Sequence, residues 1–339
     1  MIFRPLLQYG PARPVHSVAL AGGPYWFTHA ELLQRDARPR VVPVGAIPAQ
    51  ALVRLAHNRA PIAGLEFSTP CVMGILNVTP DSFSDGGQHF AAEDALAAAR
   101  AMVAAGADLL DVGGESTRPG AQEIPVDEEI RRTAPVIAAT SADLGVPISV
   151  DTRKAPVAEA ALDAGAAIVN DVAGFTFDPA LAPLCAARGA PVCVMHAQGD
   201  PQTMQDNPHY DDVVLDVYEW LEARVDALEA QGIARDQIIV DPGIGFGKTL
   251  EHNLTLLRNI AVFHGLGCPV LLGVSRKRFI GVIGNAPDAA DRAPGSIAVG
   301  LAALAQGVQI LRVHDVAETV QAIRLWQAAR GGNGSNRQS

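Results

Sequence analysis

The chain has 339 residues, of which 49% are hydrophobic and 18% charged, and its formal net charge is −10. A chain of this length and composition can bury one large core or two ordinary ones. The negative charge argues against a nucleic-acid partner and against an anionic membrane surface, because both attract basic proteins.

The four cysteines predict neither disulfides nor a metal site. They lie within apolar runs and form no CxxC pair, which is typical of buried side chains in a reducing compartment. No apolar run reaches the roughly 18 residues that a membrane span needs, and the N-terminus lacks the apolar core of a secretory signal. We therefore expect a cytoplasmic protein without a membrane partner.

Residues 1–60 differ in composition from the rest of the chain. They are rich in proline and arginine, contain no lysine and show no strand–helix alternation. Tyr25–Phe27 and Pro48–Arg59 are a candidate strand and a candidate helix. We interpret residues 1–60 as an N-terminal extension of unknown role, without which the remainder of the chain should still fold, and residues 329–339 as a flexible tail.

From Cys71 onward one local pattern recurs, in which a short apolar run ends in a polar residue and an Ala- and Leu-rich helical stretch follows. The predicted strands are Val72–Leu76, Asp108–Val112, Pro147–Val150, Ile168–Val172, Pro191–Met195, Ile238–Val240, Val270–Val274 and Gln309–Val313. The predicted helices are Ala91–Ala105, Asp127–Ala142, Val157–Ala164, Pro179–Arg188, Asp211–Gln231, Leu250–Phe263, Gly295–Gln306 and Val316–Ala329. Eight such units predict an α/β fold with a closed (β/α)₈ TIM barrel over residues 62–328, and a doubly wound open sheet is the alternative.

Polar residues end every predicted strand, and the carboxyl ends of the strands form the working face of such a barrel. These residues are Asn77, Asp111, Asp151, Asn170, Asp171, His196, Asp241, Ser275, Arg276, Lys277, Arg312, His314 and Asp315. Helix capping or turn bonding could explain one or two of them, and Asp111 and Asp171 fit that explanation about as well as any function. Polar groups at all the strand ends indicate a binding site.

Cations among these residues indicate an anionic ligand. Arg312 and His314 alternate along the last strand and therefore face the same way, and closure of the barrel brings them near Asn77. Arg118, in the glycine-rich stretch 113–120, can join them. These donors predict a diphosphate site in which Asn77 offers its oxygen to Mg²⁺.

A second set of strand-end groups predicts the other half of the ligand. Asp151, Asn170 and Asp241 offer acceptors deep in the barrel. A carboxylate with an amide complements a flat heterocycle that carries an amino group beside a ring N–H.

The segment 241–249, by contrast, only partly matches a phosphate loop, because Pro242 replaces its first glycine. We expect Lys248 to be a solvated or capping cation.

The chain from about residue 62 to 328 resembles the dihydropteroate synthase family. Two long strings carry the resemblance, MGILNVTPDSFSDGG at 73–87 and DVGGESTRPG at 111–120. Shorter matches follow in the family's order at Ser149–Thr152, Asn170–Asp171, Asp241–Lys248, Ser275–Lys277 and Arg312–Asp315. One departure is Arg153, where some members have a small residue, and this cation could alter the rim of the pocket.

The resemblance implies a pterin-binding barrel that joins 6-hydroxymethyl-7,8-dihydropterin diphosphate to p-aminobenzoate and releases diphosphate. It assigns the pterin to Asp151, Asn170, Asp241 and Lys277, the last through its carbonyl. It assigns the diphosphate to Thr117, Arg312 and His314, and Mg²⁺ to Asn77. It assigns p-aminobenzoate to Phe83, Pro119 and the helix start near Arg276–Arg278. Asp85 and Arg118 are the catalytic candidates, the first stabilising positive charge on the pterin methylene and the second neutralising the leaving diphosphate.

The resemblance also implies a homodimer, with small-molecule substrates and no nucleic-acid partner. Two other functions stay open. A pterin- or folate-binding methyltransferase would have no diphosphate for Arg118, Arg312 and His314 to bind. A non-catalytic paralogue would have a degenerate anion site.

Overall fold

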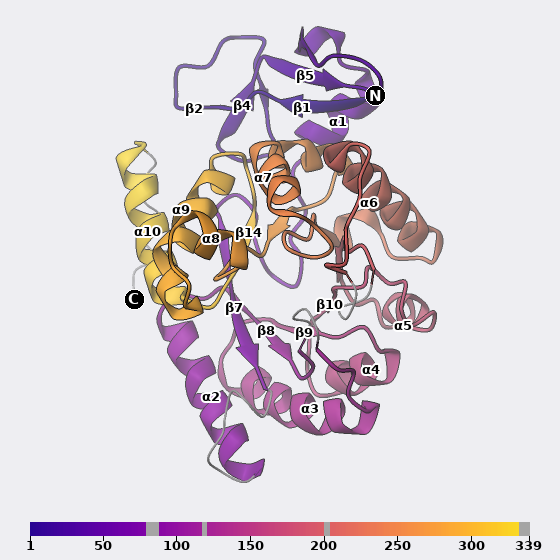
Figure 1. Ribbon diagram of the computed structural model, residues 1–339, viewed down its shortest axis with the longest axis vertical. Helices are drawn as coiled ribbons and strands as arrows, with labels where there is room; N and C mark the ends of the chain where they lie inside the picture. Colours follow the sequence, from indigo (N-terminus) through magenta and orange to yellow (C-terminus); the bar gives the residue numbers. More distant parts are fainter. Residues whose placement is uncertain (79–87, 117–120, 200–203, 332–339) are drawn as a thin grey trace.

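A parallel eight-stranded sheet forms the body of the protein, whose computed structural model describes residues 1–78, 88–116, 121–199 and 204–331 (Figure 1). The strand order is β12-β11-β10-β9-β8-β7-β14-β13, and a parallel bridge between Val240 and Val270 joins the two edges. The predicted (β/α)₈ barrel is thus confirmed, and the open-sheet alternative is wrong.

The barrel strands begin and end close to the predicted positions. They are β7 (Cys71–Asn77), β8 (Leu109–Gly113), β9 (Ile148–Asp151), β10 (Ile168–Asp171), β11 (Val192–Met195), β12 (Ile238–Asp241), β13 (Leu271–Leu272) and β14 (Ile310–Val313). Each is short and buried, as strands covered by helices on one side and by the barrel interior on the other must be.

Helices surround the sheet. They are α2 (Gln88–Ala104), α3 (Val126–Asp143), α4 (Ala155–Asp163), α5 (Leu181–Arg188), α6 (Val213–Ala230), α7 (Leu250–Arg258), α8 (Arg278–Ile283), α9 (Ala293–Leu304) and α10 (Val316–Ala329). Short 3₁₀ helices are η3 (Arg235–Gln237), η4 (Ile260–Leu266) and η5 (Ala289–Arg292). The single helix predicted over Leu250–Phe263 is divided at Asn259 into α7 and η4. No helix among the described residues is long and apolar enough to cross a membrane.

The first part of the chain folds into two small antiparallel sheets and a helix at one end of the barrel (Figure 1). One sheet contains β1 (Ile2–Pro5), β5 (His29–Leu33) and β6 (Arg40–Pro43), and the other contains β2 (Gln8–Tyr9), β4 (Tyr25–Phe27) and β3 (Val18–Ala19). The turn η1 (Val44–Ala46) leads to α1 (Ala49–Ala56). The expected strand at Tyr25–Phe27 and helix near Pro48–Arg59 are confirmed.

This segment packs on the barrel. Phe27, Leu20 and Leu55 are almost fully buried in a core of their own. Arg54 forms an ion pair with Glu222 of α6 at 2.7 Å, and the guanidinium of the buried Arg59 donates to the carbonyl of His264 in η4 at 3.0 Å. Because of these contacts, we expect removal of the segment to destabilise the barrel, in contrast to the expectation from composition alone.

The amino-terminal end of the barrel is closed by an apolar plug. Ile62, Leu65 and Phe67 of the connecting segment are buried against the inward-facing side chains at the start of the strands. Those side chains are Cys71, Met73, Leu109, Ile168, Cys193, Ile239, Leu271 and Ile310. The polar groups of the barrel interior are therefore gathered at its other end.

Candidate active site

Four strand ends meet in one hydrogen-bonded charge group inside the barrel. Arg312 of β14 donates from Nε to Asp111 Oδ2 of β8 at 2.6 Å and from Nη2 to Asp151 Oδ2 of β9 at 2.8 Å. Asn170 Nδ2 of β10 donates to Asp111 Oδ2 at 3.1 Å. Asp111 therefore does not cap a helix; it is a partner of Arg312 and Asn170 within the site.

Several acceptors of this group have no protein partner. Asp111 Oδ1, Asp151 Oδ1 and Ser149 Oγ are buried and make no hydrogen bond among the described residues. Buried polar atoms are nearly always bonded in folded proteins, and leaving them unbonded is costly. Three such atoms on two neighbouring strands indicate a ligand with several N–H donors. Sequence reasoning missed Ser149, although its place two residues before Asp151 puts both on the same face of the strand.

Burial changes the electrostatics of Asp151. Desolvation raises the pKa of this carboxyl, the Arg312 guanidinium opposes that effect and the nearby Asp111 carboxylate reinforces it. A carboxyl group with a raised pKa accepts or shares a proton more readily than an exposed one. A ligand N–H would therefore find a strong acceptor here.

Asp241 and Lys277 form the opposite wall. Asp241 Oδ1 accepts the Gly243 N–H at 2.7 Å, and burial raises the pKa of this carboxyl while Lys277 lowers it. Lys277 Nζ donates to the Ile244 carbonyl and lies 4.7 Å from the ring centre of Phe246. Burial lowers the pKa of Lys277 to about 8, against the attraction of Asp241.

The carbonyl of Lys277, which the resemblance assigns to the pterin, accepts the Ile280 N–H of α8 at 3.1 Å. The ammonium is the group of Lys277 that lies in the electrostatic field of Asp241 and Arg312. The ammonium of Lys277 is therefore a second group, besides the carbonyl, that could meet a ligand.

Asn77 ends β7 beside Gly113 of β8, and Gly113 pairs in turn with Asp151 of β9. A β-carbon placed on Gly113 would lie 3.7 Å from Asn77 Oδ1 and 3.8 Å from Asp151 Oδ2. The missing side chain thus leaves room next to both the amide oxygen and the carboxylate oxygen. No group of three or more His, Cys, Asp or Glu side chains suited to a metal occurs among the described residues.

His314 lies at the end of β14, two residues after Arg312. Its Nδ1 is 2.9 Å from Ser275 Oγ, which also accepts the His314 backbone N–H at 3.1 Å. Arg276 donates from Nε to Asp315 at 3.0 Å. The His314 imidazole is thus held by a serine, whereas Arg276 is neutralised by a carboxylate.

Two strand-end groups have structural roles. Asp171 accepts the backbone N–H groups of Ala173 at 2.7 Å and Phe175 at 2.6 Å, so the turn-bonding interpretation is correct for this residue. His196 Nδ1 lies 2.9 Å from Lys248 Nζ, and burial lowers the pKa of His196 to about 2. This neutral, buried imidazole supports the loop that contains Lys248.

Lys248 is buried, so of the two predicted alternatives the solvated cation is wrong, whereas a cation that caps backbone carbonyls agrees with the structure. Its ammonium donates to the carbonyls of Gly243 and Phe246, both at 2.9 Å. Gly243 has a φ of +68°, and a β-carbon there would lie 1.8 Å from the His196 carbonyl oxygen. Lys248 therefore closes a compact loop behind Asp241, which agrees with the rejection of a phosphate loop in this segment.

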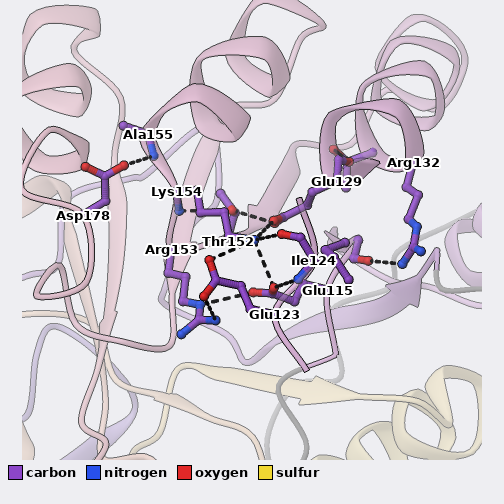
Figure 2. Close-up of polar contacts among 12 residues, drawn as sticks. Glu115, Glu123, Ile124, Glu129, Arg132, Thr152, Arg153, Lys154, Ala155 and Asp178 are labelled. Carbon is purple, nitrogen blue, oxygen red and sulfur yellow. Dashed lines mark hydrogen bonds and ion pairs between the residues drawn. The ribbon is translucent and has the colours of Figure 1, made fainter. Parts of the chain in front are cut away.

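A second buried charge cluster lies beside the site (Figure 2). Glu115 follows β8, Arg153 and Lys154 follow β9, and Glu129 belongs to α3; all four side chains are at most 10% exposed. Arg153, expected at the pocket rim, donates to Glu115 at 3.1 Å and lies 4.0 Å from the ring centre of Phe177. No sequence pattern indicated this cluster, because its members belong to three separate segments.

Five predicted site residues lie outside the described residues. They are Phe83, Asp85, Thr117, Arg118 and Pro119. Their assignments rest on the sequence alone.

Comparison with known proteins supports the same interpretation. The family model of the pterin binding enzymes matches residues 73–314. Dihydropteroate synthase of Escherichia coli (strain K12) is 48% identical over 264 residues, which cover 78% of this chain and 93% of that protein. The stretch before residue 73 lies outside the family model.

Solved structures agree in fold. Dihydropteroate synthase of Xanthomonas albilineans with 4-aminobenzoic acid is 47% identical, with a TM-score of 0.75, covering 79% of this chain and 96% of that one. The same enzyme in complex with 7,8-dihydropteroate gives 43% identity and a TM-score of 0.71, covering 78% and 95%. The barrel, its strand-end residues and these likenesses together establish that the chain belongs to the dihydropteroate synthase family of pterin-binding transferases.

Proposed function

We propose that this protein condenses 6-hydroxymethyl-7,8-dihydropterin diphosphate with p-aminobenzoate, giving 7,8-dihydropteroate and diphosphate. The observation that carries the proposal is the set of unbonded buried acceptors on Asp111, Ser149 and Asp151, beside the guanidinium of Arg312. A pterin ring supplies N–H donors to such acceptors. Arg312 would neutralise the charge that develops on the departing group.

The pterin is held between two walls. Asp151 and Asn170 belong to one wall, and Asp241 with the Lys277 ammonium belongs to the other. The raised pKa values of both carboxyls reflect the low polarity of the barrel interior, in which hydrogen bonds to ring N–H groups gain strength. Ring orientation follows from these bonds, and orientation sets where the reactive methylene lies.

The diphosphate is bound at the rim. Arg312 and His314 stand on alternate positions of β14, and Thr117 and Arg118 join them from the loop after β8. Arg312 uses Nε and Nη2 on the two aspartates, and a guanidinium has five N–H donors. Neutralising the leaving oxygens lowers the barrier to breaking the C–O bond, without any nucleophile from the enzyme.

Asn77 is the residue that would hold Mg²⁺. Its amide oxygen is a hard oxygen ligand, which suits an ion that keeps most of its waters and binds phosphate oxygens. When bound, Mg²⁺ supplies positive charge that stabilises the leaving diphosphate. The Asn77 amide would thereby help to orient the diphosphate end of the substrate.

The aromatic amine is the nucleophile. Phe83 and Pro119 are assigned to the walls of the p-aminobenzoate site, and the start of α8 near Arg276–Arg278 to its carboxylate. Asp85 and Asp151 would stabilise the positive charge that spreads from the methylene into the ring. A neutral aromatic amine attacks without a strong base, so the demand for general base catalysis is small.

We further propose that the protein works in the cytoplasm as a homodimer, as the family resemblance implies. Neither a membrane nor a nucleic acid is required by the site. The charge of −10 is consistent with this proposal.

Purified protein, incubated with both substrates and Mg²⁺, should release diphosphate and form 7,8-dihydropteroate in equal amounts. Omitting Mg²⁺ should slow both the release of diphosphate and the formation of 7,8-dihydropteroate. A reaction without p-aminobenzoate is the control. Diphosphate release that does not depend on p-aminobenzoate would identify a hydrolase instead, and no release from folded protein would reject the proposal.

A further inference from the structure

A pocket lies between the first part of the chain and the amino-terminal end of the barrel. Its empty space, which includes the part open to solvent, is about 550 Å³. Residues of β2 and β4, of the connection that precedes β7, and of α10 contribute to its lining. The pocket is therefore separate from the strand-end site, which lies at the other end of the barrel.

Aromatic side chains form much of the lining of this pocket. Tyr9 of β2 and Tyr25 of β4 have ring centres 5.6 Å apart, and the rings of Trp326 and Phe67 lie in the same lining. Phe67 also belongs to the apolar plug that closes the barrel. Ring faces of this kind favour a ligand with a flat, apolar body.

Arg330, at the end of α10, supplies a cation to the pocket. Its guanidinium carbon lies 4.5 Å from the ring centres of both Tyr9 and Trp326 and 5.5 Å from that of Tyr25. The rings hold the guanidinium without neutralising its charge. No Asp or Glu occurs among the described residues that line the pocket, so the pocket favours an anion.

Three side chains of the lining have hydrogen-bond donors to spare. Arg330 Nη1 donates to Tyr25 Oη at 3.3 Å, and a guanidinium has five N–H groups in all. The Tyr25 hydroxyl accepts this bond, and its own hydrogen has no acceptor among the described residues. Burial raises the pKa of Tyr25 to about 12, so the hydroxyl keeps its hydrogen at neutral pH.

Gln309 is the third of these side chains. It is 5% exposed, and its Oε1 accepts the Val270 N–H at 2.8 Å. This bond leaves the amide NH₂ group without a partner in the described part of the chain. A ligand that meets all three side chains must accept hydrogen bonds.

A carboxylate on an aromatic ring meets these requirements. Its two oxygens can accept about four hydrogen bonds and can bind a guanidinium through two parallel bonds. Its charge complements Arg330, and its ring packs on the aromatic lining. An inorganic phosphate offers similar acceptors but no flat apolar body for the rings.

We propose that the pocket between the extension and the barrel binds a small aromatic carboxylate, with Arg330 as the residue that recognises the anion. The family model covers residues 73–314, and Arg330 and the four ring residues all lie outside this range. Because such a ligand contacts the extension, the connecting segment and α10 together, its binding should stabilise their association.

Benzoate is the simplest probe of this site, and benzamide is a neutral analogue of similar shape. The indole N–H signal of Trp326 in isotope-labelled, full-length protein reports binding at this pocket, whereas that of Trp220, which packs on His196, should not shift. Followed through Trp326, benzoate should bind about tenfold more tightly than benzamide, because it adds charged hydrogen bonds. Arg330→Gln should weaken benzoate about tenfold and remove its advantage over benzamide.

Arg324 provides the matched control. It is an exposed arginine of α10 that does not line the pocket. Arg324→Gln therefore removes the same charge from the same helix and should leave the affinity for benzoate within about twofold.

Each other outcome overturns the inference. Equal affinities of wild type and Arg330→Gln for benzoate would show that Arg330 does not recognise the anion, and equal losses in the two variants would attribute the effect to net charge. No saturable shift of Trp326 below about 10 mM benzoate, or equal affinities for benzoate and benzamide, would exclude the proposed ligand class. Should Arg330→Gln fail to fold, Tyr25→Phe, which keeps the ring and removes only the hydroxyl, should weaken benzoate about threefold, and an unchanged affinity would contradict the proposal.

Discussion

The two ends of the barrel differ in the polarity of their buried side chains. At the amino-terminal end, Ile62, Leu65 and Phe67 close the interior with apolar side chains. At the carboxyl-terminal end, Asp111, Asp151 and Arg312 form a charged group, and three acceptor atoms there remain without a partner among the described residues. Strands β8 and β14 contribute to both ends, through Leu109 and Ile310 at one and Asp111 and Arg312 at the other.

This difference separates stability from function along the strand axis. Apolar contacts at the closed end stabilise the fold in proportion to the area they bury. Buried and unbonded polar atoms at the open end act against folding, which is expected where a site is built to bind a ligand. Changes at the first end should alter unfolding, and changes at the second should alter binding.

Deleting residues 1–58 should have the largest effect, with loss of most soluble folded protein. The deletion removes Ile2 from the core of the barrel and exposes the barrel surface that the segment covers. Burying one large apolar side chain is worth roughly 1.5–3 kcal/mol, and a domain's whole stability is only about 5–15 kcal/mol. Soluble yield and thermal unfolding of the truncated protein provide the measurement. A soluble, cooperative and fully active truncated protein would show that the extension is dispensable.

Ile62→Ala should lower the free energy of unfolding by about 2–5 kcal/mol, because it leaves a cavity in the plug. The side chain of Ile62 is fully buried. Ile62→Val, which removes less volume, should cost about 0.5–1.5 kcal/mol. Urea unfolding measures both, and kcat/KM of the folded fraction should not change. A fall in kcat/KM without a fall in stability would contradict the separation of the two ends.

Asp241→Asn should weaken pterin binding by about 1.5–3 kcal/mol, because an amide places a donor where a carboxylate accepts a ring N–H. Burial raises the pKa of this carboxyl, so the folded state gains nothing from its charge and the unfolding free energy should change little. Calorimetry measures the affinity. Asp163→Asn, at an exposed aspartate paired with Arg188, is the control and should leave binding intact; equal affinity in both variants would place the pterin elsewhere.

The smallest effect should be a pH dependence of pterin affinity. Burial lowers the pKa of Lys277 to about 8, so its ammonium is present below that pH and is lost above it. Affinity should fall as pH rises through about 8, by no more than about tenfold per pH unit for one proton. The free energy of unfolding should rise with pH between the pKa of Lys277 in the folded protein and its pKa in the unfolded chain, because the unfolded chain binds the proton more tightly in that range. Lys277→Met should remove the fall in affinity, and a fall that survives this change would assign it to another group. Ionisation of the buried Asp151 carboxyl, whose pKa burial raises, would instead strengthen binding of a ring N–H as pH rises.

The fold was accessible from the sequence because each unit of the barrel repeats a local rule. An apolar run, a polar end and an Ala- and Leu-rich helix recur, and these patterns depend only on neighbouring residues. Two features of the structure that this local pattern does not predict have tertiary causes. The segment after Asn259 tightens into η4 where it meets β1 and α1, and the pairing of β1 with β5 joins segments that no local pattern relates.

Local patterns in the chain were sufficient to predict the barrel, the family and the strand ends at which the polar groups lie. The role of each polar group, in contrast, depends on tertiary contacts. Asp111 and Asp171 both end strands, yet one pairs with Arg312 across the closed barrel and the other bonds its own turn. Lys248 and Lys277 likewise differ, since the first is enclosed by loop carbonyls and the second lies in the field of Asp241. A local pattern places the backbone of a residue, whereas the partners of its side chain come from strands far away in sequence, which only closure of the barrel brings within bonding distance.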